Sequence, residues 1–508
     1  MTAPACGHSW PRCWRGPALR PAWRACQGRR RDAAVCGSGG AGACHLPPAG
    51  DRTSRCAGGR AAFGAHGAAV WTVAPGGFAR VDHPAPRAAM PPRMTAMADQ
   101  IPAARASRSA ALVPAGRPVP GMAPLATFHD VTVVPGQKVR PGTYRGGPVL
   151  PQSPDLAFTR HCRNGKPVDV PPAAPVPLPE ETVDEPLIWA GAAFPHFGHF
   201  IGDHTARILQ ARAIHPAARV ALLGLNGEGR EVVPDFVWDV LSWLSVPRRD
   251  VFLIDRPLRV RTLHIAAQSE QLGAIGPTRD YLDLVDANQA AQQLVPISND
   301  FCFVTRAGLG DDGSGRHAGE GYLVRCLENL GVTVIAPERL PLRRQLAYYA
   351  GAQRLCFAEG SALHGRQLLG RIDQRLTVLC RRPGHRHLHE IIAPRVADMD
   401  HAQVSAGVLN VISRVPPATL HAKALAIYDE ARLLSTFARE GIDLRGVWTA
   451  RDYAAARDAD IRQWLSIWLA RPTIDRPATR DAVAAGLEGM GLGDILSHLD
   501  PGDPKGAA

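Results

Sequence analysis

The sequence predicts an α/β fold in which two strand-and-helix units follow one another along the chain. Three observations support this prediction. Short apolar runs of the length of buried strands alternate with segments of helical spacing, charged residues stand at the turns, and the alternation occurs in two separate stretches. Strands that alternate with helices at this pitch need crossover connections, which are typical of parallel sheets.

The clearer of the two stretches runs from Phe301 to Arg382. We expect strands at 301–305, 332–336, 355–358 and 376–380, and helices at 321–330, 342–350 and 361–369. Ligands of parallel sheets bind beyond the carboxyl ends of the strands. The loops that follow Thr305 and Ala358 are therefore the places where we expect a binding site.

Those two loops contain residues suited to phosphate. Arg306 follows its strand directly and Arg316 comes later in the same loop, while Glu359, Gly360 and Ser361 join a strand to a helix start. A guanidinium group matches phosphate oxygens, a glycine allows close approach to a ligand, and a helix N-terminus offers unpaired N–H groups. The pattern predicts a diphosphate site. Its alternative is a pair of solvated Arg side chains beside an ordinary helix cap.

The other α/β unit comes earlier in the chain. We expect its strands at 187–190, 220–223, 251–254 and 262–266, its helices at 199–214 and 236–244, and a linker at 296–300. The sequence therefore predicts two α/β domains in succession.

The first helix of this unit begins with acid–base residues. Gly198 stands at the turn, and His199 and Asp203 are four residues apart, so they share one face of the helix. The carboxylate would orient the imidazole and raise its basicity, as a general base requires. One alternative is a histidine that only caps or packs. Another alternative is a metal site formed by His196, His199, Asp203 and His204. The absence of the H-E-x-x-H spacing argues against this metal site.

A series of short motifs runs through both units. They are Gly198-His199-Phe200-Ile201 with Asp203 and Arg207 in the first unit, and Arg306, Arg316, Glu320, Gly331-Val332, Pro337-Glu338, Gln345, Ala352 and Gly360-Ser361-Ala362-Leu363 in the second. In order and spacing these motifs resemble glycosyltransferase family 61, including its bacterial members. The resemblance covers residues 187–382.

The resemblance implies a GT-B architecture, in which two Rossmann-like domains face each other across a cleft. It implies a hexosyl- or pentosyltransferase that moves a sugar from a nucleotide-diphosphate sugar to a saccharide or other hydroxyl acceptor. Inversion, independence of metals and cofactors, and a role in surface polysaccharide synthesis are part of the same expectation. The implied site residues are His199 as the base and Asp203 as its orienting carboxylate, Arg306, Arg316, Gly360 and Ser361 at the donor diphosphate, and Glu320, Glu359 and His204 as further candidates.

Most of the net positive charge lies in the first hundred residues. This segment holds 13 Arg, no Lys and four Asp of a chain whose net charge is +12, and it consists of Ala, Gly, Arg, Pro and Cys without a sustained period. We expect it to be disordered, with translation beginning at Met90, Met94, Met97 or Met122. The remainder is nearly neutral, which argues against a nucleic-acid-binding protein.

Cysteine usage and hydropathy predict a cytoplasmic protein. Six of the 11 Cys lie in the first hundred residues without paired C-x-x-C spacing, and we expect the other five to be buried free thiols. The start lacks a continuous apolar signal region, and no run approaches the length of a membrane span. Any membrane association would be peripheral, and the sequence leaves the oligomeric state open.

These observations divide the chain into five parts. We expect a disordered segment at 1–100, an extended lead-in rich in Pro and Gly at 101–186, an acceptor-side α/β domain at 187–296, a nucleotide-sugar α/β domain at 297–415 and a helical extension at 416–508. Helical spacing at 416–439, 450–469 and 479–499 supports the extension. Trp464 and Trp468, four residues apart, are expected in its core.

Two other classes of function remain open. An NAD-dependent oxidoreductase would need a glycine fingerprint, but Gly308 and Gly310 lack the third glycine and no helix starts there. A non-catalytic scaffold protein that binds carbohydrate or nucleotide would keep the cleft without turnover. Release of nucleoside diphosphate separates the transferase from both.

Overall fold

The described part of the chain has a mixed α/β fold. A computed structural model describes residues 112–114, 122–140, 143–150, 158, 160–226 and 229–499. All of them belong to one unit, Gln100–Ala508. The expectations for residues 1–100, including disorder, six cysteines and a start at Met90, Met94 or Met97, lie outside the described residues.

The first sheet is built around β7, whose six residues are all buried. Strands β8 and β9 follow it in parallel on one side, and β10 lies parallel to it on the other. Burial on both faces is typical of a central parallel strand. The order is β1-β2-β10-β7-β8-β9, with β3 on β2 and β6 on β10. The bounds are β1 Leu112–Pro114, β2 Leu125–Arg140, β3 Thr143–Val149, β6 Glu181–Val183, β7 Leu187–Ala192, β8 Arg219–Leu223, β9 Val251–Ile254 and β10 Leu258–Ala266.

This sheet also takes in residues upstream of 187. Strand β2 runs antiparallel to β10 along most of the length of β10, and β3 pairs with β2. Residues 131–134 form the middle of β2. Buried Val131 and Val133 alternate with partly exposed residues, as in an antiparallel strand with one face on the core. Pro and Gly around this strand make its full length hard to recognise from composition.

The second sheet is parallel throughout, as the sequence predicts. Its order is β13-β11-β14-β15-β16. The four strands expected between 301 and 380 are confirmed, and so are the first two helices between them, whereas the third is only five residues long. The bounds are β11 Asn299–Val304, α6 Glu320–Asn329, β13 Thr333–Ile335, α7 Leu342–Gly351, β14 Ala352–Ala358, α8 Leu363–Gln367, β15 Arg375–Leu379, α9 His389–Ile392 and β16 Asp398–Ala402.

Helices from the two sheets share one hydrophobic core. Helix α4 (Asp235–Trp243), which lies between β8 and β9 in the chain, packs with α7 in a cluster of buried apolar side chains. The indole Nε1 of Trp243 donates a hydrogen bond of 2.9 Å to the carbonyl oxygen of Leu368, just after α8. Helix α5 (Arg279–Ala291) then leads toward β11. The shared core fixes the two sheets relative to each other within this unit.

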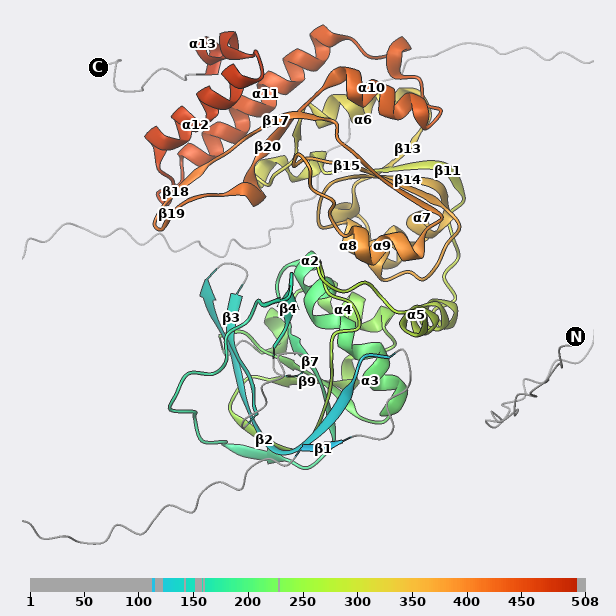
Figure 1. Cartoon of the computed structure of the whole chain (residues 1–508), viewed down its shortest axis with the longest axis vertical. Coiled ribbons are helices and arrows are strands. Elements are labelled where there is room, and N and C mark those ends of the chain that lie inside the picture. Colours follow the sequence, from blue (N-terminus) through green and yellow to red (C-terminus); the bar gives the residue numbers. More distant parts are fainter. Residues whose placement is uncertain are drawn as a thin grey trace, which may run out of the picture. The chain divides into compact units, whose positions relative to one another are not determined.

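The C-terminal region combines strands with helices. Strand β20 (Leu425–Tyr428) joins β12 (His317–Ala318) and β17 (Ser405–Leu409) in a small sheet. The helical spacing expected over 416–439 is therefore wrong in its first part, because the four residues of β20 are buried between two strands. The α-helix of this stretch is α10. Figure 1 shows α11 and α12, in red, beside β17 and β20. The other bounds are β18 Ile412–Arg414, β19 Pro417–Thr419, α10 Glu430–Arg439, α11 Ala450–Leu469, α12 Arg476–Gly489 and α13 Leu496–Leu499.

Two further expectations concern buried side chains. Trp464 and Trp468 of α11 are buried in the C-terminal core, as predicted. The cysteines of the described residues are buried and free: Cys162, Cys302, Cys326, Cys356 and Cys380. Within the described part of the chain, none of the helices has the length and apolar content that crossing a bilayer requires.

Candidate active site

A pocket of about 1250 Å³ lies beyond the carboxyl ends of β11, β13 and β14. This is the edge of the second sheet at which the sequence predicts ligand binding. Residues that follow the first sheet also line it, and so does one turn of the C-terminal region. The polar and aromatic lining includes Phe194, His196, Phe197, His199, Phe236, Asp239, Thr305, Arg306, Gly315, Glu338, Gly360, Ser361, His364, Arg381, Arg382, His387 and Lys423.

The histidines of the first sheet stand at the start of an irregular helix. His196 caps α2 (Phe197–His199), because its Nδ1 accepts a hydrogen bond of 3.3 Å from the backbone N–H of His199. The helix continues as a π-helix at Phe200–His204 and a 3₁₀ turn before α3 (Ile208–Ile214). The helix expected at 199–214 is thus present with changes of pitch, and π-turns occur often at functional sites. The rings of His196 and His199 are stacked at 4.2 Å between centroids.

Arg163 comes between His199 and Asp203. It lies on β4 (Cys162–Arg163) and donates from Nη2 to Nδ1 of His199 at 2.8 Å, and from Nε and Nη2 to the carboxylate of Asp203. The closest carboxylate oxygen of Asp203 is 3.7 Å from Nδ1 of His199. Burial, the charge of Arg163 and the neighbouring His196 lower the pKa of His199 to about 3. The expectation that Asp203 raises the basicity of His199 is therefore wrong for this arrangement.

On the opposite side of the pocket, Arg306 lies against Gly360. A Cβ atom added to Gly360 would be 1.9 Å from Nη1 of Arg306, so the absence of a side chain makes room for the guanidinium group. The Nε and Nη2 of Arg306 donate to the carbonyl oxygen of Gly315 at 3.2 and 2.9 Å. Its backbone N–H donates to buried Glu320 at 2.6 Å. The structure thus brings together Arg306, Gly360 and Ser361, which the sequence assigned to one site.

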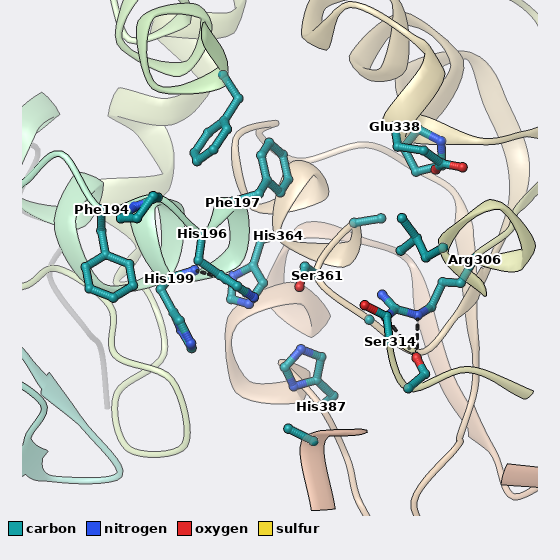
Figure 2. Close-up of a pocket in the computed structure, with 18 of the residues that line it drawn as sticks. Phe194, His196, Phe197, His199, Arg306, Ser314, Glu338, Ser361, His364 and His387 are labelled. Atoms are coloured by element: carbon teal, nitrogen blue, oxygen red, sulfur yellow. Dashed lines mark hydrogen bonds between the residues drawn. The ribbon is translucent and has the colours of Figure 1, made fainter. Parts of the chain in front are cut away.

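Figure 2 shows how these groups are arranged. His196 and His199 extend from the first-sheet helix, Arg306 and Ser314 lie on the other side, and Ser361 lies between the two groups in this view. The helix that follows Ser361 begins only at Leu363 and has five residues. The expected long helix start is therefore a single short turn, and the polar lining around Ser361 comes from side chains of several segments.

Several expected site residues do not line the pocket. Arg316 is buried and pairs with Asp460 of α11 at 3.2 Å. His204 is buried beside His161, with ring centroids 4.5 Å apart. Asp203 and Glu320 are buried behind His199 and Arg306. These residues support the walls of the pocket and their side chains are not part of its surface.

Glu359 also acts from behind the pocket. Its carboxylate accepts hydrogen bonds from the backbone N–H groups of Arg381 and Arg382, at 2.7 and 3.1 Å, and from the side chain of Arg382. Burial favours its neutral form, but His385 and Arg382 outweigh this effect and hold the pKa of Glu359 well below its usual range. Glu359 is therefore an anion that fixes the loop after β15, and two arginines of that loop reach the pocket.

Most of the charged residues of the lining are basic. Lys138, Arg306, Arg381, Arg382 and Lys423 face the pocket, and the acidic residues of its lining are Asp239 and Glu338. Among the described residues, no three His, Cys, Asp or Glu side chains come together as a metal site would require. The pocket is suited to an anionic ligand held by side-chain cations.

Sequence reasoning missed residues from distant segments that line the pocket or contact its histidines. Arg163 lies in the stretch interpreted as a lead-in, Lys423 lies in the extension, and neither belongs to a motif. His364 comes directly after the Gly360-Ser361-Ala362-Leu363 motif, and its position one turn after Ser361 is a signal that could have identified it. His387 belongs to a run of alternating histidines at 385, 387 and 389, and the structure places it in the pocket lining.

A comparison with protein families connects this pocket to a known activity. Residues 197–366 match the family model described as Glycosyltransferase 61. These residues are therefore similar to glycosyltransferase family 61. The match includes His199, Arg306, Gly360 and Ser361 and ends just after His364. No curated protein is similar enough in sequence to count as a match.

This match supports a glycosyltransferase activity, in agreement with the resemblance found in the sequence motifs. A glycosyltransferase binds a sugar donor and an acceptor. Lys423, Arg381, Arg163 and Glu270 lie outside the matched residues, although the first three contact the pocket or its histidines.

Proposed function

We propose that this family 61 enzyme transfers a sugar from a nucleotide-diphosphate sugar to a hydroxyl group of a saccharide, with inversion and without a metal ion. The observation that carries the proposal is the position of Arg306 against Gly360, in a basic pocket that histidines of the first sheet also line. The donor lies on the second-sheet side and the acceptor on the first-sheet side. Such a division corresponds to the GT-B architecture, which the parallel second sheet supports.

The donor diphosphate is bound by side-chain cations. As the bond between the anomeric carbon and the phosphate oxygen breaks, negative charge develops on the leaving diphosphate. Arg306 and the neighbouring Arg381, Arg382 and Lys423 provide positive charge at that place. Preorganised charge of this kind stabilises the transition state more than the ground state, because little reorganisation is needed when the bond breaks.

The acceptor must lose a proton during the transfer. Its hydroxyl oxygen attacks the anomeric carbon, the electron pair of the broken bond leaves with the diphosphate, and a base of the pocket takes the hydroxyl proton. His199 is the base that the sequence motifs suggest. In the structure its Nδ1 accepts from Arg163, so its neutral ring carries the proton on Nε2. His199 can act as a base only after Arg163 leaves Nδ1 and Asp203 takes up an Nδ1–H bond.

A donor panel tests this function directly. The full chain would be incubated with nucleotide-diphosphate sugars that differ in base and in hexose or pentose, with and without oligosaccharides of a surface polysaccharide as acceptors. Release of nucleoside diphosphate that depends on the acceptor supports the proposal. Nucleotide binding without release under every condition would indicate a scaffold protein, and hydride transfer to or from NAD would indicate an oxidoreductase.

A further inference from the structure

His364 is held rigidly in the wall of the pocket. Its side chain is 5% exposed, and the ring lies against two glycines of the histidine-bearing helix. A Cβ atom on Gly198 would be 2.8 Å from Cδ2 of His364, and one on Gly202 would be 2.9 Å from its Cε1. Any larger residue at either position would displace the ring. The ring therefore has one well-defined orientation. Its hydrogen bonds then determine which of the two ring nitrogens carries the hydrogen.

A buried chain of polar groups determines where His364 carries its proton. Arg395 pairs with Glu270 at 2.8 Å, and both side chains are almost fully buried. The carboxylate of Glu270 accepts a hydrogen bond of 2.6 Å from Nε2 of Gln367. Because a carboxylate only accepts, the amide nitrogen of Gln367 must face Glu270, and its oxygen must face His364.

The consequence for His364 follows from the remaining contact. Its Nδ1 lies 3.1 Å from Oε1 of Gln367. An amide oxygen cannot donate, so Nδ1 of His364 must carry the hydrogen. The neutral ring then has an unprotonated Nε2, and no described residue is bonded to this atom. The chain Arg395–Glu270–Gln367 thus leaves a free lone pair on a histidine that lines the pocket.

The two neighbouring histidines have the opposite arrangement. Nδ1 of His196 accepts from the backbone N–H of His199, and Nδ1 of His199 accepts from Arg163. In the neutral state both rings carry their hydrogen on Nε2, so each can donate there and neither offers a lone pair. Of these three histidines, His364 is the one prepared to accept a proton.

We propose that Nε2 of His364 is the general base of the transfer, an inference that rests on the proposed function. As the acceptor oxygen bonds to the anomeric carbon, its O–H bond breaks and the proton moves to Nε2, while the diphosphate leaves with the electron pair. The resulting imidazolium keeps its Nδ1–H bond to Gln367. The backbone N–H of His364 donates to the carbonyl oxygen of Ser361 at 3.1 Å, so the base lies one turn from the donor-side residues.

The electrostatic surroundings link this base to donor binding. Burial and the charges of His387, His196 and Arg163 together lower the pKa of His364 to about 3, although the hydrogen bond to Gln367 opposes this shift. A bound diphosphate adds negative charge to the same pocket and therefore raises the pKa of His364. The proton acceptor becomes stronger when the donor is present. Without the donor, Nε2 is unprotonated but weakly basic.

Two measurements on the full chain test the inference. Nitrogen NMR of the imidazole-labelled protein reports the tautomer of His364 without any substrate, and its signals are assigned by comparison with H364Q. We expect Nδ1–H in the wild type and a mixture of tautomers in Q367L, which removes the amide oxygen. A wild-type spectrum with the hydrogen on Nε2 would overturn the inference.

Kinetics test the catalytic role. General-base assistance is worth roughly 10²–10⁴-fold, so H364Q should lower kcat by that factor. The Kd for the nucleoside diphosphate released by the active donor should change by less than about twofold, which also shows that the variant is folded. Q367L should lower kcat less and leave that Kd unchanged. The control H389Q makes the same change in a histidine outside the pocket lining and should retain wild-type kcat.

The outcomes separate the two proposals. If the wild type turns over a donor and H364Q keeps its kcat, His364 is not the base and the proposed function stands. If no donor is turned over by the wild type, the proposed function fails, and the catalytic role of His364 fails with it. In that case the tautomer measurement still shows whether the buried chain controls the ring.

Discussion

Neighbouring residues hold the side chain and the backbone of Arg306 in place. Gly315 accepts two hydrogen bonds from its guanidinium group, Glu320 fixes its backbone, and Gly360 leaves space for Nη1. These contacts hold the planar group in place before a ligand arrives, which lowers the entropy cost of binding.

Arg306→Ala should weaken binding of the nucleoside diphosphate and leave the fold intact. The loss of a charge-assisted hydrogen bond costs about 1.5–3 kcal/mol, which is roughly ten- to hundredfold in Kd. Arg306→Lys should recover only part of the affinity, because the ammonium group keeps the positive charge but lacks the bidentate fork. Titration calorimetry with nucleoside diphosphates measures both changes. An unchanged Kd in both variants would remove Arg306 from the donor site.

Gly360→Ala should weaken the same binding through Arg306. The added methyl group would be 1.9 Å from Nη1, so the guanidinium group must move. We expect a loss of affinity comparable to that of Arg306→Ala, and little further loss when Gly360→Ala is added to Arg306→Ala. A double-mutant cycle measures this coupling. Additive effects of the two substitutions would show that Gly360 acts on the ligand directly.

Arg163→Met should raise the pKa of His199. In the wild type burial lowers this pKa to about 3, and the charge of Arg163 contributes in the same direction. Without Arg163, Asp203 is the nearest charged partner of the imidazole, and an adjacent carboxylate favours the protonated ring. Proton NMR titration of the imidazole signals, assigned with His199→Gln, provides the measurement. A pKa that stays near 3 would show that burial alone sets it.

At the scale of elements, the C-terminal region completes the pocket. Strand β20 pairs with β12, and this pairing places 422–424 beside Gly315, where an added Cβ would be 2.7 Å from the carbonyl oxygen of Ala422. Arg381 donates to the carbonyl oxygen of Ala424 at 2.8 Å. Lys423 lines the pocket from this turn, and its charge contributes to the lowered pKa of His196.

Lys423→Ala should therefore weaken nucleoside diphosphate binding although the residue lies outside the family match. A half-buried ammonium near the diphosphate should contribute about 1 kcal/mol, or roughly fivefold in Kd, and the contribution should fall at high salt. Lys166→Ala is the matched control, because Lys166 is exposed on β5 (Lys166–Pro167) and absent from the pocket lining. Equal Kd values for both variants at low salt would exclude Lys423 from the site.

At the scale of the whole molecule, buried histidines connect stability to pH. Burial lowers the pKa values of His317 and His364 to about 3, and both side chains are at most 5% exposed. In the unfolded chain a histidine has a pKa near 6.5. Between these values the unfolded state binds more protons than the folded state. The contribution of these histidines to the free energy of unfolding is therefore fully present above pH 6.5 and is lost as the pH falls toward 3.

Stability should accordingly decrease between pH 6.5 and pH 5. For each such histidine, the free energy of unfolding should fall by about 1.4 kcal/mol per pH unit below 6.5. Urea unfolding at pH 7.5, 6.5 and 5.5 measures the slope, and His364→Gln should reduce it by the share of one histidine. The lowered pKa of Glu359 affects stability only at a more acidic pH, below the ordinary pKa of a glutamate. A stability that is constant from pH 7.5 to 5.5 would contradict the buried neutral state of these rings.

The sequence by itself determined the second sheet, its parallel order of strands and helices, and the edge at which Arg306, Gly360 and Ser361 meet. Such features follow from periodicity and glycine placement within short windows of the chain, which are local properties. Strand β20 escaped this reasoning because its four apolar residues are too short a run to show a period, and its neighbours β12 and β17 are separate segments.

Only the tertiary structure decided where individual side chains point. Arg316 pairs with Asp460, Arg163 separates His199 from Asp203, and Lys423 reaches the pocket because segments far apart in sequence pack together. The proton position on His364 depends on Glu270, almost a hundred residues earlier in the chain. Hydrogen-bond direction is a property of complete networks, so the chemistry of the pocket histidines became visible only when all members of each network were in place.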